Sequence, residues 1–380
     1  MLPVFYQTHL KSQLNLAEFI FLKILLNLLQ SIKKVSLESL ANAWPIPIKF
    51  ESRSKRIQRF LSLPNLTLEK IWFPIVTGCL ETYFRSNQIL YLVIDRTNWG
   101  CINLLMLSIV WDKRAFPVYF ELLPKLGSSN LQEQKAALSQ VIPVLKNYQV
   151  CLLGDREFCS IKLANWLWEQ NLSFCLRLKQ NEFVQVKTEI WLELNNLGLT
   201  PGVSFFLAGV KVTKMKGFRS FNVACKWKRK ILGVAPKEGW FICTNFATLP
   251  LAIAAYKQRF RIEGMFRDLK KGGYNLEDTN VSGDRLIVLI LLIAIAYTST
   301  TIQGQQIKRK GIQKYIGRVK EHGRIERRHS SFYIGLFGQT WVNFMPDCME
   351  LVTELMKINC NKQKYYQLGL RAMKLVMAVS

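Results

Sequence analysis

Three consecutive apolar runs between residues 89 and 124 constrain the fold of this chain more than any other feature. The runs ILYLVID, CINLLMLSIVW and AFPVYFELLP are rich in β-branched and aromatic residues and are separated by short polar turns. Such runs predict three strands joined by tight turns. Apolar residues at helical spacing follow at 131–146 and 161–169, and each of these segments leads into a further strand-like run, VCLLGD or SFCLRLK.

This order of elements predicts an α/β fold with an RNase H-like core, in which the early strands pair antiparallel and helices cross over to parallel strands. Short β-like runs rich in lysine interrupt the alternation, and helical patterns occupy both ends of the chain. We therefore expect a helical, DNA-binding region at 1–88, the first part of the core at 89–182 and a β-rich basic insertion at 183–239. The second part of the core is expected at 240–300, and a basic, helical region for DNA binding or dimerisation at 301–380.

The charge balance favours a polyanionic partner. The 380 residues contain 52 Lys and Arg against 26 Asp and Glu, a formal net charge of +26. Nucleic acid is the simplest partner for such an excess, although a membrane surface or a ribosome would also attract it. Three histidines make a histidine-based metal site or a serine–histidine triad unlikely to form, and nine cysteines without a CxxC pair fit a reducing cytoplasm. Apolar stretches at 14–29 and 286–297 are expected to be buried helices, and no signal peptide is predicted.

Two basic segments are candidates for contact with DNA. Arg53 and Arg56 lie in SRSKRIQRF, which fits a compact helical DNA-binding unit, with a plain helical cap and a solvated basic face as the alternative. The predicted insertion carries the second set, with Lys226, Lys228 and Arg229 as its central members. The full set is Lys211, Lys214, Lys216, Arg219, Lys226, Lys228, Arg229 and Lys230.

Three acidic residues are candidates for catalysis. Asp95 follows the run ILYLVI, Asp155 follows VCLLG, and Glu263 lies in a helix expected at 249–271. Acidic residues at strand ends are common in turns, and Glu263 alone could be an ion-pair partner of a neighbouring cation. Together, three carboxylates from two strand ends and one helix can hold two Mg²⁺ ions, because this ion prefers hard oxygen ligands.

The helix expected at 249–271 carries a regular motif. Tyr256, Arg259, Glu263 and Lys270 are spaced Y-x2-R-x3-E-x6-K, which places them within roughly 60° of one another on an α-helix. One face would then carry a phenol, a carboxylate and two cations. We expect Arg259 and Lys270 to hold the phosphates that flank a bond broken at the metal ions.

These residues resemble the IS4-family DDE transposases of bacterial insertion sequences. The resemblance rests on D-x-T at Asp95, G-D-R-E around Asp155 and the Y-R-E-K motif, and it covers about residues 89 to 300. It implies that Asp95, Asp155 and Glu263 are catalytic and bind two Mg²⁺ ions, with Mn²⁺ as a substitute. It also implies cut-and-paste transposition through a DNA hairpin, with Trp240 stacking on an extruded base.

The same resemblance implies the partners of the chain. They are double-stranded DNA, both as terminal inverted repeats and as target, and a second copy of the chain in a synaptic homodimer. A bacterial cytoplasmic, nucleoid-associated location would follow. Two alternatives stay open: a nuclease or resolvase with an RNase H-like core that cuts DNA without joining it, and an inactive copy that only binds DNA.

Overall fold

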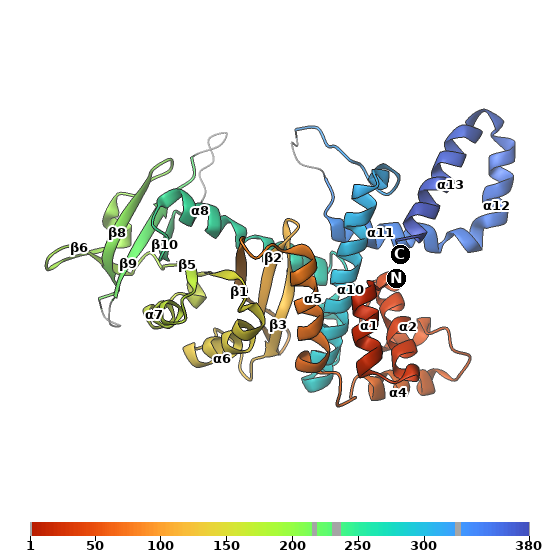
Figure 1. Cartoon of the computed structure of the whole chain (residues 1–380), viewed down its shortest axis with the longest axis horizontal. Helices are drawn as coiled ribbons and strands as arrows, with labels where there is room; N and C mark the ends of the chain where they lie inside the picture. Colours follow the sequence, from red (N-terminus) through yellow and green to blue (C-terminus); the bar gives the residue numbers. More distant parts are fainter. Residues whose placement is uncertain (1, 215–218, 230–236, 324–327, 380) are drawn as a thin grey trace. The chain divides into compact units, whose positions relative to one another are not determined.

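The computed structural model describes residues 2–214, 219–229, 237–323 and 328–379. The chain divides into two compact units, one formed by residues 79–264 and the other by residues 1–78 together with 265–380 (Figure 1). The five-part division expected from the sequence stays a prediction. Lys216 and Lys230 of the basic set lie outside the described residues.

A mixed sheet forms the centre of the unit 79–264. Its first three strands, β1 (Ile89–Trp99), β2 (Ile102–Trp111) and β3 (Arg114–Leu122), pair antiparallel. β4 (Gln149–Gly154) pairs parallel to β1, and β5 (Ser173–Arg177) pairs parallel to β4. Helix α6 (Leu131–Val141), continued by a 3-10 turn (Ile142–Leu145), and helix α7 (Ile161–Glu169) provide the crossovers. The strand and helix order predicted for this part of the chain is confirmed.

The segment predicted as an insertion continues the same sheet. β6 (Phe183–Lys187), β7 (Ile190–Glu193), β8 (Ser204–Val212), β9 (Arg219–Lys226) and β10 (Trp240–Thr244) extend it beyond β5. The described strands form one ten-stranded sheet in the order β3-β2-β1-β4-β5-β10-β9-β8-β6-β7. β10 pairs antiparallel with both β5 and β9, so it links the core strands to the added ones.

Local sequence signals set several helix starts in both units. Asn130 and Glu133 form a capping box at the start of α6, in which each side chain binds the backbone N–H of the other residue. Asn15 and Glu18 do the same for α2 (Leu16–Ile32). Ser36 accepts a bond from the backbone N–H of Ser39 at the start of α3 (Leu37–Ala43).

The second unit is helical. Its N-terminal part contains α1 (Val4–Gln13), α2 (Leu16–Ile32), α3 (Leu37–Ala43), α4 (Phe50–Phe60) and a π-helical turn (Leu68–Trp72) that leads into α5 (Phe73–Tyr83). Its C-terminal part contains α10 (Gly283–Arg309), α11 (Ser331–Asn343), α12 (Met345–Ile358) and α13 (Gln363–Met377). Helix α10 runs through this unit and packs against α2 and α11 (Figure 1).

Helix α10 is a buried core helix, as expected from its apolar sequence. Among the described helices it is the one long and apolar enough to cross a membrane, but 94% of its most apolar 18-residue window is buried inside the protein. Two glycines let it approach α11 closely. A Cβ added at Gly304 would lie 1.8 Å from the carbonyl oxygen of Ser331, and one added at Gly335 would lie 2.0 Å from that of Thr300. Only residues without a side chain fit this crossing.

Candidate active site

Asp95 and Asp155 lie next to each other across the central pair of strands. The parallel pairing of β1 with β4 ends at Ile94 and Gly154, and each aspartate is the next residue of its strand segment. Asp95 does not follow the end of its strand, as the sequence suggested, because β1 continues to Trp99 in its antiparallel pairing with β2. The two carboxylates still share the edge at which the parallel pair ends.

The backbone fixes the orientation of both carboxylates. The Oδ1 atom of Asp95 accepts a 2.8 Å bond from the N–H of Arg96, and the Oδ1 atom of Asp155 accepts a 2.7 Å bond from the N–H of Arg156. Gly154 allows the close packing behind Asp155, since an added Cβ would lie 2.9 Å from the Cβ of Phe158. Each aspartate is therefore held by the residue that follows it.

The helix predicted at 249–271 is two helices. α8 (Leu249–Gln258) and α9 (Arg261–Leu269) are separated by a break at Arg259 and Phe260. Arginine and phenylalanine are tolerated within helices, so the local sequence carries no signal for this break. The tertiary contacts of the two side chains account for it: Arg259 is buried among acidic groups, and the ring of Phe260 stacks on Trp240.

Arg259 joins two of the three candidate acids. Its Nη1 atom lies 3.5 Å from Oδ2 of Asp95, and its Nη2 atom lies 2.7 Å from Oε1 of Glu263. Only 5% of Arg259 is exposed, so the guanidinium group depends on these carboxylates for its compensation. The structure thus brings Arg259, Glu263 and Asp95 together, and the pair of Glu263 with Arg259 is the ion-pair alternative given for Glu263 in the sequence analysis.

The acidic groups are close enough to affect each other's ionisation. Burial raises the pKa of Asp95 to about 6, in spite of the opposing effects of the Arg96 N–H and the Arg259 charge. The charges of Asp155 and Glu263 raise the pKa of Asp95 further. Burial also raises the pKa of Tyr256, the first residue of the motif. A carboxyl group that titrates near neutrality among other acids is typical of a functional site.

The donor atoms of the three acids are of the type that Mg²⁺ prefers. All three acids offer oxygen ligands, and the mutual repulsion around Asp95 would be relieved by a divalent cation. Within the described residues, however, no three His, Cys, Asp or Glu side chains are close enough to hold one ion. Arg259 occupies an oxygen of both Asp95 and Glu263, which accounts for the open arrangement.

Lys270 directly follows the last residue of α9, and its backbone N–H still bonds to the carbonyl of Phe266. It lies beyond the end of α9, in the unit formed by 1–78 and 265–380, and its Nζ atom is 2.6 Å from Oε1 of Glu277. The break at Arg259 and Phe260 interrupts the helix between Tyr256 and Glu263, so the four motif residues do not lie on one continuous helix as the sequence predicted.

A second set of ion pairs supports the two aspartates, and the sequence analysis missed it. Nε of Arg96 lies 3.0 Å from Oε1 of Glu157, and its Nη2 lies 3.1 Å from Oε2, so the pair is bidentate. Glu157 also accepts a 3.0 Å bond from the N–H of Ser129. Arg96 and Glu157 lie within two residues of Asp95 and Asp155. Their charges in D-R-T and D-R-E were the signal that could have identified the pair.

Asp155 lies near a second buried arginine, Arg177. Nη1 of Arg177 lies 4.0 Å from Oδ1 of Asp155, and Nη2 lies 2.8 Å from Oε1 of Glu238. Glu238 also pairs with Arg156 at 3.1 Å. Arg177 is buried at the end of β5, so it holds the loop before β10 against the Asp155 segment. No sequence motif pointed to Arg177 or Glu238.

Aromatic rings gather beside the acids. The rings of Trp240 and Phe260 are stacked with centroids 5.6 Å apart, and the ring of Tyr256 meets Trp240 edge-on at 5.3 Å. Nζ of Lys228 lies 5.2 Å from the centroid of Trp240, and the guanidinium carbon of Arg259 lies 4.4 Å from that of Phe260. Phe260 is 38% exposed and Trp240 is half-buried, so the pair reaches the surface.

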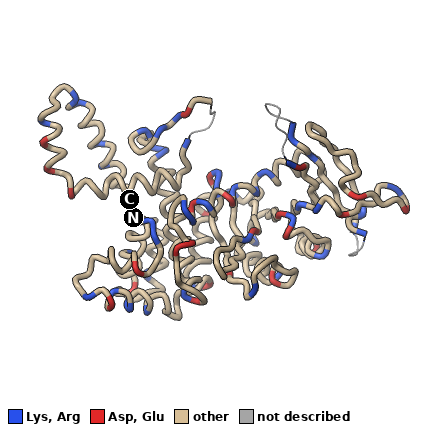
Figure 2. The backbone as a smooth tube through the Cα atoms, turned by 180° about the vertical axis from the view of Figure 1, so that it is seen from behind, with Lys and Arg blue, Asp and Glu red and all other residues tan. Residues whose placement is uncertain are grey.

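The remaining predicted DNA contacts are divided between surface and structural positions. Lys228, Arg229 and Arg56 are exposed, whereas Lys226 at the end of β9 is half-buried. Nη1 of Arg53 donates a 3.1 Å bond to the carbonyl of Trp44, which engages the guanidinium group within the helical unit. Figure 2 shows that lysine and arginine residues occur along the whole chain, with acidic residues between them.

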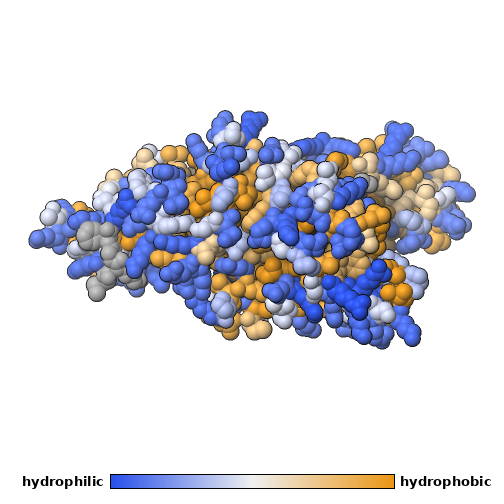
Figure 3. Space-filling model, turned by 60° about the horizontal axis from the view of Figure 1, so that its bottom comes forward, coloured by the Kyte–Doolittle hydropathy of each residue, from blue (hydrophilic) through white to orange (hydrophobic). Residues whose placement is uncertain are grey.

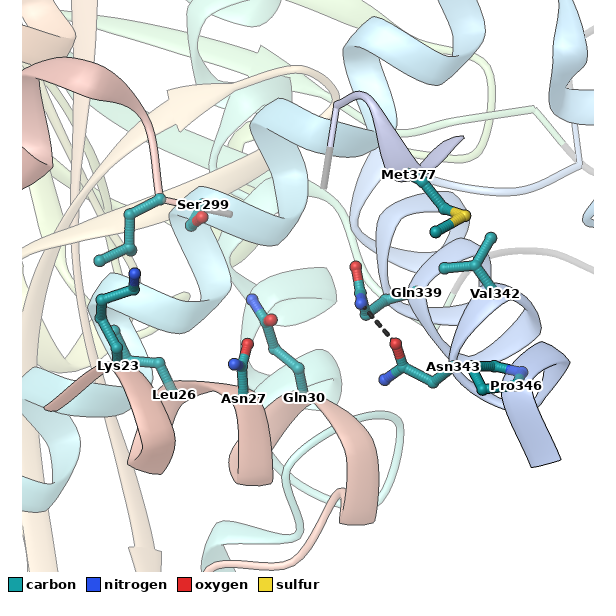
Figure 4. Close-up of a pocket in the computed structure, with 11 residues that line it drawn as sticks. Lys23, Leu26, Asn27, Gln30, Ser299, Gln339, Val342, Asn343, Pro346 and Met377 are labelled. Carbon is teal, nitrogen blue, oxygen red and sulfur yellow. Dashed lines mark hydrogen bonds between the residues drawn. The ribbon is translucent and has the colours of Figure 1, made fainter. Parts of the chain in front are cut away.

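A separate cavity of about 410 Å³ lies in the helical unit and is not a candidate active site. Side chains of α2, α10 and α11 point into it, among them Gln30, Ser299 and Gln339 (Figure 4). Its described lining contains one lysine, Lys23, and no acidic residue, so it offers no general base and no carboxylate ligand.

Two solved structures are similar to the chain at low identity: a piggyBac transposase synaptic complex with hairpin DNA, and a Marinitoga piezophila Argonaute in complex with a 5′-OH guide RNA. The first is 15% identical with a TM-score of 0.45, covering 92% of this chain and 78% of that one. The second is 11% identical with a TM-score of 0.24, covering 59% and 34%.

The sequence comparisons give the family. The search of curated proteins gave no match. Residues 102–299, more than half of the chain, match the transposase DDE domain, and this segment contains Asp155 and Glu263 but begins after Asp95. The chain therefore belongs to the family of transposases with a DDE domain.

Proposed function

We propose that this chain catalyses metal-dependent cut-and-paste transposition of DNA, with Asp95, Asp155 and Glu263 as its catalytic acids. The observation that carries the proposal is the position of Asp95 beside Asp155 where the β1–β4 pairing ends, together with its link to Glu263 through Arg259. Two carboxylates at one sheet edge, with a third linked to them through Arg259, repel one another unless a cation compensates their charge. In a transposase of the DDE family, bound metal ions would compensate the charges of these carboxylates.

The oxygen-only donor set supports Mg²⁺ as the cofactor, with two ions bound and Mn²⁺ as a substitute. When bound, such ions supply an activated water or 3′-hydroxyl and stabilise the leaving oxygen in phosphodiester chemistry. Asp95, Asp155 and Glu263 would hold these ions, and the ions would compensate the charges of Asp155 and Glu263 that raise the pKa of Asp95. Arg259 releases Glu263 in this arrangement and turns to a DNA phosphate, for which its planar, bidentate guanidinium group is suited.

The order of steps follows that of the IS4 family, to which we assign the chain on its Y-R-E-K residues. Water cleaves one strand at the element end, and the freed 3′-hydroxyl attacks the opposite strand to form a hairpin. The hairpin is reopened and the 3′-hydroxyl joins target DNA. Trp240 and Phe260 support this sequence because a paired aromatic surface beside the acids can stack on an unpaired base.

The partners in this proposal are terminal inverted repeats, target DNA and a second copy of the chain. Lys228, Arg229 and Arg56 are exposed and available for phosphate contacts. Lys226 and Arg53 would contribute at the margins of these surfaces, and Lys270 would need to leave Glu277 to reach a phosphate. A bacterial nucleoid in the cytoplasm is the compartment that fits these partners.

A cleavage and joining assay tests the proposal. The substrate is a linear fragment that carries the coding sequence with its flanking DNA, incubated with Mg²⁺, with Mn²⁺ or with EDTA. Wild type and the control Glu169→Gln, which alters an exposed carboxylate of α7, should give hairpin ends and joined products in either metal. Glu263→Gln and Asp155→Asn should give neither.

The outcomes separate the alternatives. Metal-dependent cutting without any joined product would replace the proposal with a nuclease or resolvase. Binding of the flanking DNA without cutting under every metal condition would identify an inactive copy that acts as a DNA-binding protein. Equal activity of Glu263→Gln and wild type would remove Glu263 from the site.

A further inference from the structure

The cavity between α2, α10 and α11 contains hydrogen-bonding atoms that the protein itself leaves unused. Its volume of about 410 Å³ lies within the range of about 300–1,000 Å³ typical of small-molecule sites. Figure 3 shows hydrophobic side chains exposed among hydrophilic ones on one face of the molecule, so exposed apolar surface by itself does not identify a binding site. Buried polar atoms without partners are much rarer, and each one in a native protein requires an explanation.

Two such atoms belong to residues that line this cavity. Ser299 of α10 is 1% exposed, and its Oγ atom has no hydrogen-bond partner among the residues that the structure describes. The Oε1 atom of Gln339 on α11 is also buried, and the described part of the chain offers it no donor. An unpaired buried oxygen destabilises the folded protein unless a molecule in the cavity supplies the missing hydrogen bond.

Hydrogen bonds within the helical unit determine which atoms face the cavity. Nδ2 of Asn343 donates a 3.2 Å bond to Oγ of Ser31, and Oδ1 of Asn343 accepts a 2.7 Å bond from Nε2 of Gln339. Gln339 therefore presents its remaining atom, the acceptor Oε1. Gln30 of α2 is arranged in the same way, because its Nε2 atom donates a 2.9 Å bond to Oγ1 of Thr300. Figure 4 shows the two glutamines extending from α2 and α11 into the same space.

The chemistry of the lining excludes several classes of ligand. The described lining contains no acidic residue, so an organic cation or a divalent metal ion would find no opposite charge there. A purely apolar ligand would leave the buried oxygens of Ser299 and Gln339 unpaired. Lys23 is exposed and supplies a positive charge to the cavity. The ligand that fits therefore combines N–H donors for the buried oxygens with an anionic group for Lys23.

A nucleotide whose base carries an amino group has this combination. The amino group of adenine donates two hydrogen bonds, and carboxamide side chains are its usual partners. The phosphate supplies the anionic group, which a lysine binds as a point charge. Leu26, Val342 and Met377 provide apolar walls against which a planar ring can pack.

We propose that this cavity binds a nucleotide with an amino-bearing base. Ser299, Gln30 and Gln339 accept hydrogen bonds from the base, and Lys23 contacts the phosphate. A free nucleotide and an unpaired base of a DNA strand share this chemistry, and the experiment distinguishes these two sources. The inference does not depend on the proposed reaction, because none of the active-site acids lines the cavity.

Calorimetric titration of the full chain in EDTA tests the site, with dAMP as the probe. Three further probes each lack one part of dAMP: the purine deoxynucleotide without the 6-amino group, deoxyadenosine without the phosphate, and inorganic phosphate without the nucleoside. We expect dAMP to bind, and we expect loss of the amino group or of the phosphate to weaken binding about fivefold or more. Inorganic phosphate alone should bind more weakly than dAMP.

Variants of the lining locate the bound nucleotide. Ser299→Ala removes a hydroxyl without a described partner, so it should weaken dAMP binding about threefold or more while the urea unfolding midpoint stays unchanged or rises. Gln339→Met keeps the length of the side chain without its carboxamide and should weaken binding about fivefold or more. The control Gln367→Met alters an exposed glutamine of α13 and should bind dAMP like wild type.

A second pair of variants tests the phosphate contact. Lys23→Met should remove the difference in affinity between dAMP and deoxyadenosine, because the phosphate then has no cation in the lining. The control Lys357→Met changes an exposed lysine of α12 and should preserve this difference. Circular dichroism of each variant checks that the helices are retained.

The outcomes are decisive in both directions. Failure of dAMP to bind at about 1 mM, or binding that Ser299→Ala and Gln339→Met leave unchanged, would overturn the proposal and assign the cavity to water. Equal affinity for the nucleotide without the amino group would overturn it as well.

A short deoxyadenosine oligonucleotide distinguishes the two sources of the base. Weaker binding of this oligonucleotide to both Ser299→Ala and Gln339→Met would place a base of a DNA strand in the cavity. If the two variants weaken the binding of dAMP alone, the ligand is a free nucleotide. The titrations contain no metal ion and need no cleavage, so failure of the nucleotide site and failure of the proposed reaction are distinguishable.

Discussion

Replacing Asp95 by asparagine should stabilise the metal-free protein near neutral pH. The pKa of Asp95 rises from 3.8 to about 6, a difference of about 2 units, because burial disfavours the ionised form. At about 1.36 kcal/mol per unit, the ionised carboxylate makes the folded state less stable by about 3 kcal/mol. Asparagine has the same shape, carries no charge and can still accept the bond from the N–H of Arg96. It loses the attraction of Arg259, so we expect a net gain of about 1–3 kcal/mol.

The pH dependence of this gain has a definite sign. Because the folded pKa of Asp95 lies above the unfolded value of 3.8, the cost is absent well below that value, where the group is protonated in both states. The cost grows as the pH rises from 3.8 to about 6 and is complete above that range. The advantage of Asp95→Asn should therefore be largest at about pH 8 and be reduced to a small fraction of that value near pH 4.

Urea unfolding in EDTA at both pH values measures the effect. The control Glu169→Gln should change the free energy of unfolding by less than about 0.5 kcal/mol at either pH. Mg²⁺ should stabilise wild type, with the ion bound by Asp95, and should stabilise Asp95→Asn less. If Asp95→Asn were less stable than wild type at about pH 8, the ion pair with Arg259 would outweigh burial and the reasoning would be refuted.

Three further predictions concern packing, support of the aspartates and phosphate contact. In urea unfolding, Gly335→Ala should lower the free energy of unfolding by about 1–3 kcal/mol, because its Cβ would overlap the Thr300 carbonyl. The control Gly369→Ala has open space around it, so it should leave this free energy unchanged or raise it by up to about 1 kcal/mol. Glu157→Gln removes the negative charge that pairs with Arg96, so it should lower the free energy of unfolding by about 1–2 kcal/mol and reduce cleavage with either metal ion. Full cleavage activity of this variant would show that the pair does not position Asp95. Arg259→Lys keeps the positive charge but loses the planar guanidinium group, so it should reduce the rate of single-turnover cleavage about tenfold or more while the protein remains folded. An unchanged rate would exclude a bidentate contact between Arg259 and a phosphate.

The sequence by itself determined the elements whose signals are local. The apolar runs from 89 to 124 became β1, β2 and β3, and the alternation after them became α6, β4, α7 and β5, because strand and helix periodicities differ and turns separate the runs. Asp95 and Asp155 could be identified because both follow runs that pair in parallel, which makes their neighbouring positions a consequence of strand order.

Only the tertiary structure decided how the site is completed. Lys270 pairs with Glu277, a residue beyond the end of α9. The break at Arg259 coincides with its contact to Asp95, which is distant in sequence and which helical spacing cannot report. The same holds for Arg177 and Glu238, and for the continuation of the sheet from β5 through β10 to the added strands. Local sequence patterns depend only on neighbouring residues. Buried charges lose their hydration and need ion-pair partners, and tertiary packing determines which partners lie close enough.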